Sequence, residues 1–110
     1  MIEVTVNRYT DGTIKGFQMS GHANSGPYGH DLVCAAASAV SFGAVNAVIS
    51  LCDIEPLIDQ RDDGGFLDVT LPTDLADDVR QRAQLLLDGM VVSLETIERD
   101  YGQYIHISTS

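Results

Sequence analysis

A chain of 110 residues is long enough for one domain with its own hydrophobic core and too short for two ordinary ones. Apolar residues make up 45% of the chain and charged residues 20%, which is the balance of a folded domain rather than of a disordered one. The formal net charge of −10 argues against binding to nucleic acid, because that binding depends on cationic neutralisation of phosphates, and against docking on anionic lipid. We therefore expect a single domain over residues 1–110, with no nucleic acid and no membrane among its direct partners.

The cysteines and the first residues predict a reducing, cytoplasmic environment. Two cysteines, Cys34 and Cys52, are too few for a disulfide-stapled scaffold, and residues 1–6 lack the cationic start and apolar core of a signal peptide. Residues 32–52 carry no charge and are long enough to span a bilayer. Small and polar residues interrupt this stretch and acidic residues flank it, so we expect a buried helix of a soluble domain instead.

The first elements in chain order are two strands that form a hairpin. Residues 2–7 alternate apolar and polar, as a strand with one buried face does. Asp11-Gly12 is a turn signal, and residues 13–20 predict a second strand whose apolar phase changes near Gly16, where we expect a bulge. Residues 21–30 contain three glycines and a proline without an apolar period, which predicts a loop.

A long uncharged helix is expected next. Asp31 is a favourable N-cap, and the alanine-rich run that follows it has helix propensity through Leu51. Because this helix carries no charge on any face, it should be covered on more than one side, by the sheet and by a second helix or another subunit. This pattern is the first indication of an oligomer.

The second half of the chain predicts another hairpin, a helix and a last strand. Residues 57–61 and 66–71 flank a turn, and Thr73 or Asp74 is expected to cap an amphipathic helix. The apolar stripe of that helix consists of Leu75, Val79, Ala83, Leu86, Leu87, Met90, Val91, Leu94 and Ile97. A last strand over 104–108 completes the order ββαββαβ, which indicates an α+β fold with two layers, the helices lying on one face of a mostly antiparallel sheet.

The candidate chemistry lies between the first hairpin and the first helix. With Asp31 as the N-cap, Cys34 would stand in the first turn of the helix, where free backbone N–H groups and the helix dipole favour a thiolate and could stabilise an oxyanion. His22 and His30 lie upstream, and either imidazole could accept the thiol proton and deliver it to a leaving amine. This chemistry requires no metal and no cofactor.

Other interpretations of the same residues remain open. Ser38 lies one helical turn beyond Cys34 and could orient the nucleophile or the substrate, or only bond back to its own backbone. Asp31 could be a cap, could orient an imidazole, or could place a charge at the mouth of the site. A cysteine in a helix is more often a small buried hydrophobe than a nucleophile, and a zinc site would require a ligand spacing that this segment does not have. We expect Cys52 to be structural and His106 to face solvent.

The segment also resembles a known family. Gly21-His22-Ala23, then Gly29-His30-Asp31-Leu32-Val33-Cys34-Ala35-Ala36 and Ser38, look like the signature of the bacterial ribosomal-processing cysteine proteases, the Prp family. The resemblance covers nearly the whole chain. It implies a homodimeric cysteine endopeptidase that removes a short N-terminal extension from the large-subunit ribosomal protein L-twenty-seven, its partner being that precursor.

The resemblance also implies roles for individual residues. His22 maps to the general base and Cys34 to the nucleophile, while Asp31 and Ser38 fall on supporting positions of the site. Gly21 matches the hinge of a loop that rearranges when the substrate peptide arrives. His30 stands where a lysine is common in the family, which leaves a second histidine as an alternative base.

A second hypothesis from another class is a non-catalytic ribosome-assembly module that holds a basic peptide in an acidic cleft. The charge distribution bears on both hypotheses. Residues 1–52 hold three acids and two bases, whereas residues 53–110 hold thirteen acids and four bases. The acidity therefore lies outside the half of the chain with the motif, and its expected use is long-range attraction of a basic substrate.

Overall fold

The computed structural model describes residues 1–22, 27–61 and 65–110, and the side chains of residues 27–31 lie outside the description. The elements follow the predicted order ββαββαβ. They are β1 (Ile2–Arg8), β2 (Ile14–Ser20), α1 (Pro27–Cys52), β3 (Leu57–Gln60), β4 (Phe66–Thr70), α2 (Asp77–Tyr101) and β5 (Ile105–Thr109). The two hairpins, both helices and the last strand were all predicted, and the last strand begins one residue later than expected.

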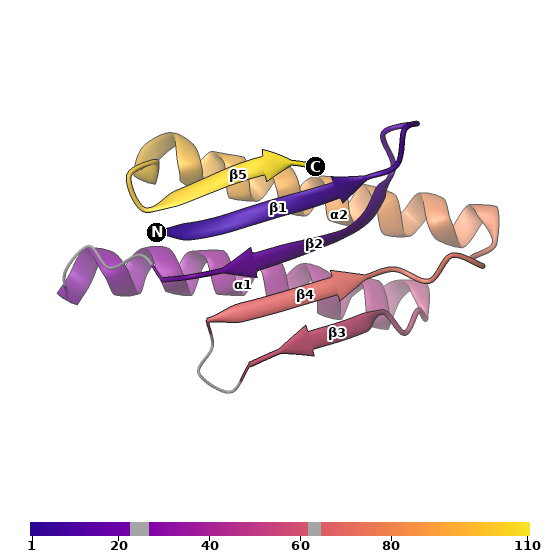
Figure 1. Ribbon diagram of the computed structural model, residues 1–110. Helices are drawn as coiled ribbons and strands as arrows, with labels where there is room; N and C mark the ends of the chain where they lie inside the picture. Colours follow the sequence, from indigo (N-terminus) through magenta and orange to yellow (C-terminus); the bar gives the residue numbers. More distant parts are fainter. Residues whose placement is uncertain (23–26, 62–64) are drawn as a thin grey trace.

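The five strands form one mixed sheet in the order β3-β4-β2-β1-β5 (Figure 1). The pairs β1–β2, β2–β4 and β3–β4 are antiparallel, while β1 and β5 run parallel. The chain reaches the parallel position of β5 through α2, as a parallel pair requires a crossover connection. The sheet is thus mostly antiparallel, as the sequence predicts.

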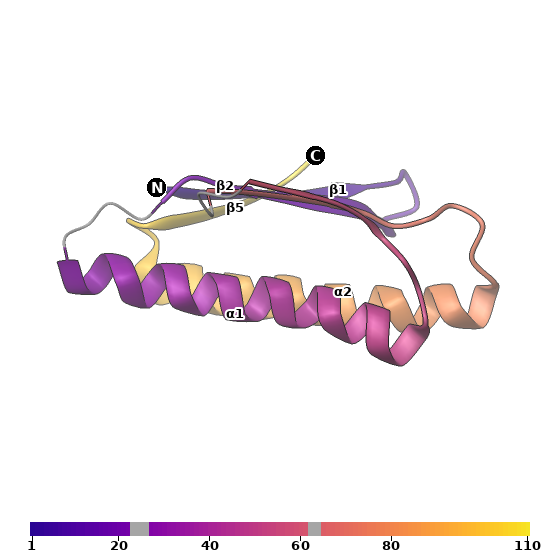
Figure 2. The same cartoon turned by 90° about the horizontal axis from the view of Figure 1, so that it is seen from below.

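Both helices lie on one face of the sheet, which makes the domain two layers thick (Figure 2). The core fills the space between the layers. Alternate residues of β1 and β2, among them Val4, Val6 and Phe17, are almost fully buried and meet the apolar stripe of α2. The opposite face of the sheet carries the polar alternate residues and has no helix over it.

The first helix begins five residues earlier than predicted. Asp31 is the fifth residue of α1 and not its N-cap, because the helix starts at Pro27. Proline is compatible with the first position of a helix, where its missing N–H costs no hydrogen bond and its φ is already suitable. The expectation of a loop over residues 27–30 is therefore wrong, and the part of that expectation that concerns residues 23–26 lies outside the described residues.

The second helix begins later than predicted. Neither Thr73 nor Asp74 caps it; Ala76 is the N-cap and makes no side-chain cap hydrogen bond. Leu71 donates its N–H to the carbonyl oxygen of Lys15, at 3.0 Å, so the chain leaves the sheet after the residue at which the second hairpin was expected to end. It then has to cross to the helix layer before α2 can start.

One face of α1 is not covered by the rest of the chain. Phe42 and Ile49, seven residues apart on one side of the helix, are exposed by 38% and 40%. The segment Leu32–Cys52 is apolar and long enough to cross a membrane by length and composition alone, and 28% of it is buried within the chain. The sheet and α2 cover the other sides of the helix. The sequence predicts that α1 is covered on more than one side, and this chain leaves one face of it exposed.

Gly16 holds the bulge that the sequence predicts in β2. Asn7 pairs with Gly16 and Arg8 with Ile14, so Lys15 is the extra residue. A Cβ atom placed on Gly16 would lie 2.1 Å from the carbonyl oxygen of Val69 on β4. The close approach of β2 and β4 at this point therefore requires glycine.

Gly16→Ala is expected to lower the free energy of unfolding by about 1–3 kcal/mol, because the backbone of β4 has to move to admit the methyl group. Gly89→Ala is the matched control, since a Cβ at Gly89 in α2 meets no atom within 4 Å. That variant should raise the stability by about 1 kcal/mol through helix propensity. Urea denaturation of the three proteins measures both effects, and a neutral Gly16→Ala would show that the sheet tolerates a wider spacing there.

Candidate active site

A small pocket lies between the end of β2 and residues 34–38 of α1. Its volume is about 50 Å³. The described residues that line it come from both layers and are Ile2, Met19, Gly21, His22, Cys34, Ala37, Ser38 and Gly65. Four predicted site residues, namely Gly21, His22, Cys34 and Ser38, thus share one pocket.

The helix α1 supplies the thiol side of the pocket. Cys34 is half-buried and packs against the core, while Val33 and Ala37 beside it are buried almost completely. Since residues four apart lie on the same face of a helix, Ser38 stands one turn beyond Cys34 and also faces the pocket. Packing of this helix against the sheet therefore fixes where the thiol lies.

Gly21 turns the chain so that His22 reaches the pocket. Its φ is +89°, a conformation that residues with a side chain rarely adopt, and a Cβ there would lie 2.4 Å from the carbonyl oxygen of Met1. Its N–H donates to the carbonyl oxygen of Gly65 at 3.0 Å. These two contacts hold the backbone at Gly21 beside Met1 and beside the start of β4.

The floor of the pocket contains residues that the sequence analysis did not select. Met19 and Ile2 were assigned only to the core faces of their strands, and Gly65 was part of a predicted turn. Ser41, which is fully buried, donates its hydroxyl to Sδ of Met19 at 3.6 Å. The strand periodicity places Met19 inward, but only the three-dimensional packing of β2 on α1 brings it beside the thiol.

The helix geometry corrects one argument from the sequence. Because α1 begins at Pro27, Cys34 is its eighth residue, beyond the first four N–H groups that a helix leaves without a partner. The backbone N–H groups of Cys34 and Ala35 are therefore not free to form an oxyanion hole, and Cys34 is not in the first turn. The side chains of His30 and Asp31 lie outside the described residues, so the structure joins neither of them to the pocket.

The pocket can support thiol chemistry with an imidazole. His22 and Cys34 are the two ionisable groups among the described residues that line it. Within the described part of the chain, no three histidine, cysteine, aspartate or glutamate side chains are grouped so that they could hold a metal ion. As expected, Cys52 is buried in the core and His106 is exposed, with its Nδ1 lying 3.3 Å from Oε2 of Glu98.

The chain is similar to curated proteins over its whole length. A model of the family described as cysteine protease Prp matches residues 1–106. The ribosomal processing cysteine protease Prp of Bacillus subtilis is 52% identical over 110 residues, which are 100% of this chain and 98% of that protein. The protein of the same name from Staphylococcus aureus is 43% identical, with 97% of this chain and 95% of that protein covered.

The fold is similar to solved structures as well. The S. aureus Prp protease in complex with a covalently linked product peptide has a TM-score of 0.88 and 42% identity, with 100% of both chains covered. The same protease in complex with a substrate peptide has a TM-score of 0.86 and 41% identity, again with full coverage of both chains. The match of sequence and of fold along nearly the entire chain shows that this protein belongs to the cysteine protease Prp family and is a cysteine peptidase.

Proposed function

We propose that this protein is the peptidase that removes a short N-terminal extension from the precursor of the ribosomal protein L-twenty-seven, with Cys34 as its nucleophile and His22 as its general base. The observation that carries the proposal is that a thiol and an imidazole share one small pocket in a chain of this family. The curated relatives are named ribosomal processing proteases, and a related structure holds a covalently linked product peptide.

The chemistry follows from the two side chains. The imidazole of His22 accepts the proton of the Cys34 thiol as the sulfur attacks the carbonyl carbon of the scissile peptide bond. The imidazolium then donates that proton to the departing amine, which leaves a thioester on Cys34. A water molecule, deprotonated by His22, hydrolyses the thioester and restores the thiol. Ser38 supports the site from the next turn of α1. The family resemblance gives a supporting role to Asp31 as well, whose side chain lies outside the described residues.

Two geometric features support this assignment. The half-burial of Cys34 against the core limits the directions from which a substrate carbonyl can approach the sulfur. Gly21, which the family resemblance makes the hinge of a loop that rearranges when the peptide arrives, has a positive φ, as the turn of the chain before His22 requires. Rearrangement about Gly21 when the peptide enters would adjust the position of the imidazole relative to the thiol.

The assembly and location belong to the same proposal. We expect a cytoplasmic homodimer in which the uncovered apolar face of α1, defined here by Phe42, Asn46 and Ile49, meets its copy. Phe42 and Ile49 lie seven residues apart on one side of the helix and are 38% and 40% exposed. An exposed apolar face of this kind often marks an interface with another protein chain.

Cys34→Ala and His22→Ala are each expected to abolish cleavage of the extended precursor while leaving the fold intact, because they remove the nucleophile and the base. Cys52→Ala is the matched control, since that thiol lies in the core, and His30→Ala should also retain activity. Mass spectrometry of the peptide products is the measurement. Loss of activity in His30→Ala instead of His22→Ala would transfer the role of base to His30, and full function of Cys34→Ala would favour the non-catalytic assembly module.

The acidic residues are expected to affect substrate capture rather than turnover. Asp59 and Asp68 face each other across β3 and β4 on the sheet face without helices. Replacing both by asparagine should lower kcat/KM roughly threefold at low salt and leave kcat unchanged, because a basic precursor is then attracted less strongly. The difference should vanish at high salt, where the charges are screened. An equal loss of kcat would contradict long-range steering.

The dimer is tested at the same α1 face. The double variant Phe42→Glu, Ile49→Glu should sediment as one chain where the wild-type protein sediments as two, because two like-charged faces no longer associate. Leu85→Glu is the control, since Leu85 is 74% exposed on α2 among charged residues. A wild-type protein that sediments as a single chain at micromolar concentration would refute the homodimer.

A further inference from the structure

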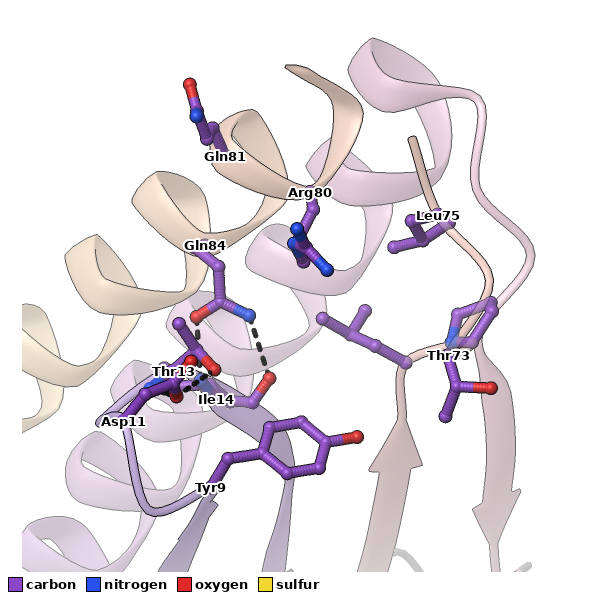
Figure 3. Close-up of a pocket in the computed structure, with 11 residues that line it drawn as sticks. Tyr9, Asp11, Thr13, Ile14, Thr73, Leu75, Arg80, Gln81 and Gln84 are labelled. Carbon is purple, nitrogen blue, oxygen red and sulfur yellow. Dashed lines mark hydrogen bonds between the residues drawn. The ribbon is translucent and has the colours of Figure 1, made fainter. Parts of the chain in front are cut away.

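A second and larger pocket lies at the end of the molecule away from Cys34. It has a volume of about 360 Å³, within the range of small-ligand sites, and forms where the β1–β2 turn, the segment after β4 and the first turns of α2 meet (Figures 1 and 3). The peptidase chemistry described above uses none of its residues. What this pocket binds is therefore a separate question.

The walls of this pocket are held by hydrogen bonds. The side-chain amide of Gln84 clamps the backbone of Ile14, accepting its N–H at 2.7 Å and donating to its carbonyl oxygen at 2.8 Å (Figure 3). The N–H of Tyr9 donates to the carbonyl oxygen of Thr13 at 2.8 Å across the turn. A pocket whose walls are fixed in this way needs little ordering on binding, which favours affinity.

One side of the pocket is apolar. Leu71, Pro72 and Leu75 come from the segment after β4, and Tyr9, which follows β1, lines the same pocket. Tyr9 is held in turn by Lys15, whose Nζ lies 5.1 Å from the ring centroid. This side suits an aliphatic or aromatic side chain.

The other side of the pocket carries one cation and one anion, Arg80 and Asp11. The guanidinium of Arg80 points into the pocket (Figure 3), and its contact with Asp77 engages one of its nitrogens. Oδ1 of Asp11 accepts from both the hydroxyl and the N–H of Thr13, at 2.6 and 2.9 Å. These hydrogen bonds hold the pKa of the Asp11 carboxyl below its usual value, so this group is ionised at neutral pH and its second oxygen remains an acceptor.

We propose that this pocket binds a short peptide with both ends free, its carboxylate at Arg80, its ammonium at Asp11 and an apolar side chain against Tyr9 and Leu75. Arg80 already pairs with Asp77 through one nitrogen, so a ligand carboxylate would bind its remaining N–H groups. A ligand ammonium would bind the second oxygen of Asp11, and a zwitterion makes both contacts. The apolar side of the pocket also requires an apolar group on the ligand, which a simple ion does not have. The site is thus a peptide-binding site, remote from the thiol.

The test is an NMR titration of the full chain with leucyl-leucine, its N-acetyl form and its C-terminal amide. The free dipeptide should give saturable shifts confined to the residues that line the pocket, and either capped form should bind about tenfold more weakly, because each loses one charge-assisted hydrogen bond. Absence of saturable shifts, or equal binding of the capped forms, would overturn the proposal. Equal shifts with sodium acetate would identify a simple anion site and overturn it too.

Two variants show whether the charges act as assigned. Arg80→Gln should bind the C-terminal amide as well as it binds the free dipeptide, because the variant has no cation that a ligand carboxylate could pair with. Asp11→Asn should likewise bind the N-acetyl form as well as the free dipeptide, because the variant has no anion for a ligand ammonium. Asparagine keeps the acceptor that Thr13 uses, so the turn is preserved. Arg82→Gln and Asp78→Asn are the matched controls, since these residues pair with each other at 3.6 Å and lie outside the pocket. Controls that weaken binding equally would contradict the assignment.

Discussion

The packing of α1 against the sheet is the constraint on which the rest of this structure depends. Val33, Ala37, Val45 and Val48 of this helix are buried beneath β2 and its neighbours. Cys34 follows directly after the first of these anchors, so its sulfur lies at the boundary between core and solvent. Moving the helix by one residue would turn the thiol either into the core or away from the end of β2.

The second requirement is that the backbone comes close at two glycines. At Gly16 the strands β2 and β4 leave no room for a Cβ, and at Gly21 the chain passes against the carbonyl group of Met1 with a positive φ. The first contact keeps β4 in register beside β2, and the second directs His22 towards α1. The site is therefore a consequence of sheet geometry as much as of the residues that carry the chemistry.

Much of the fold could be predicted from local sequence patterns, because those patterns have direct physical causes. The period of two in residues 2–7, the phase change near Gly16 and the stripe on α2 each report which side chains face a core, and all three were confirmed. The predicted starts of both helices were wrong, because each start depends on more than a local pattern. Pro27 and Gly29 were taken as breakers although the first turn of a helix accepts proline, and the start of α2 depends on the residues that cross from the sheet to the helix layer after Leu71.

The two pockets show the limit of such patterns most clearly. The residues with evident chemistry near Cys34 were selected from the sequence, but Ile2, Met19 and Gly65 were not, because their proximity results from strand pairing and layer packing. The pocket at Arg80 and Asp11 joins residues from three separate segments, and no local motif connects them.

The central claim is that Cys34 is the nucleophile of this peptidase. Its most direct test is labelling with the precursor extension converted to a chloromethyl ketone, followed by mass mapping of the labelled fragment and an assay of residual cleavage. The account predicts one label per chain on the fragment with Cys34, none on Cys52, and loss of cleavage in proportion to labelling. Cleavage that persists after Cys34 is fully labelled would contradict it.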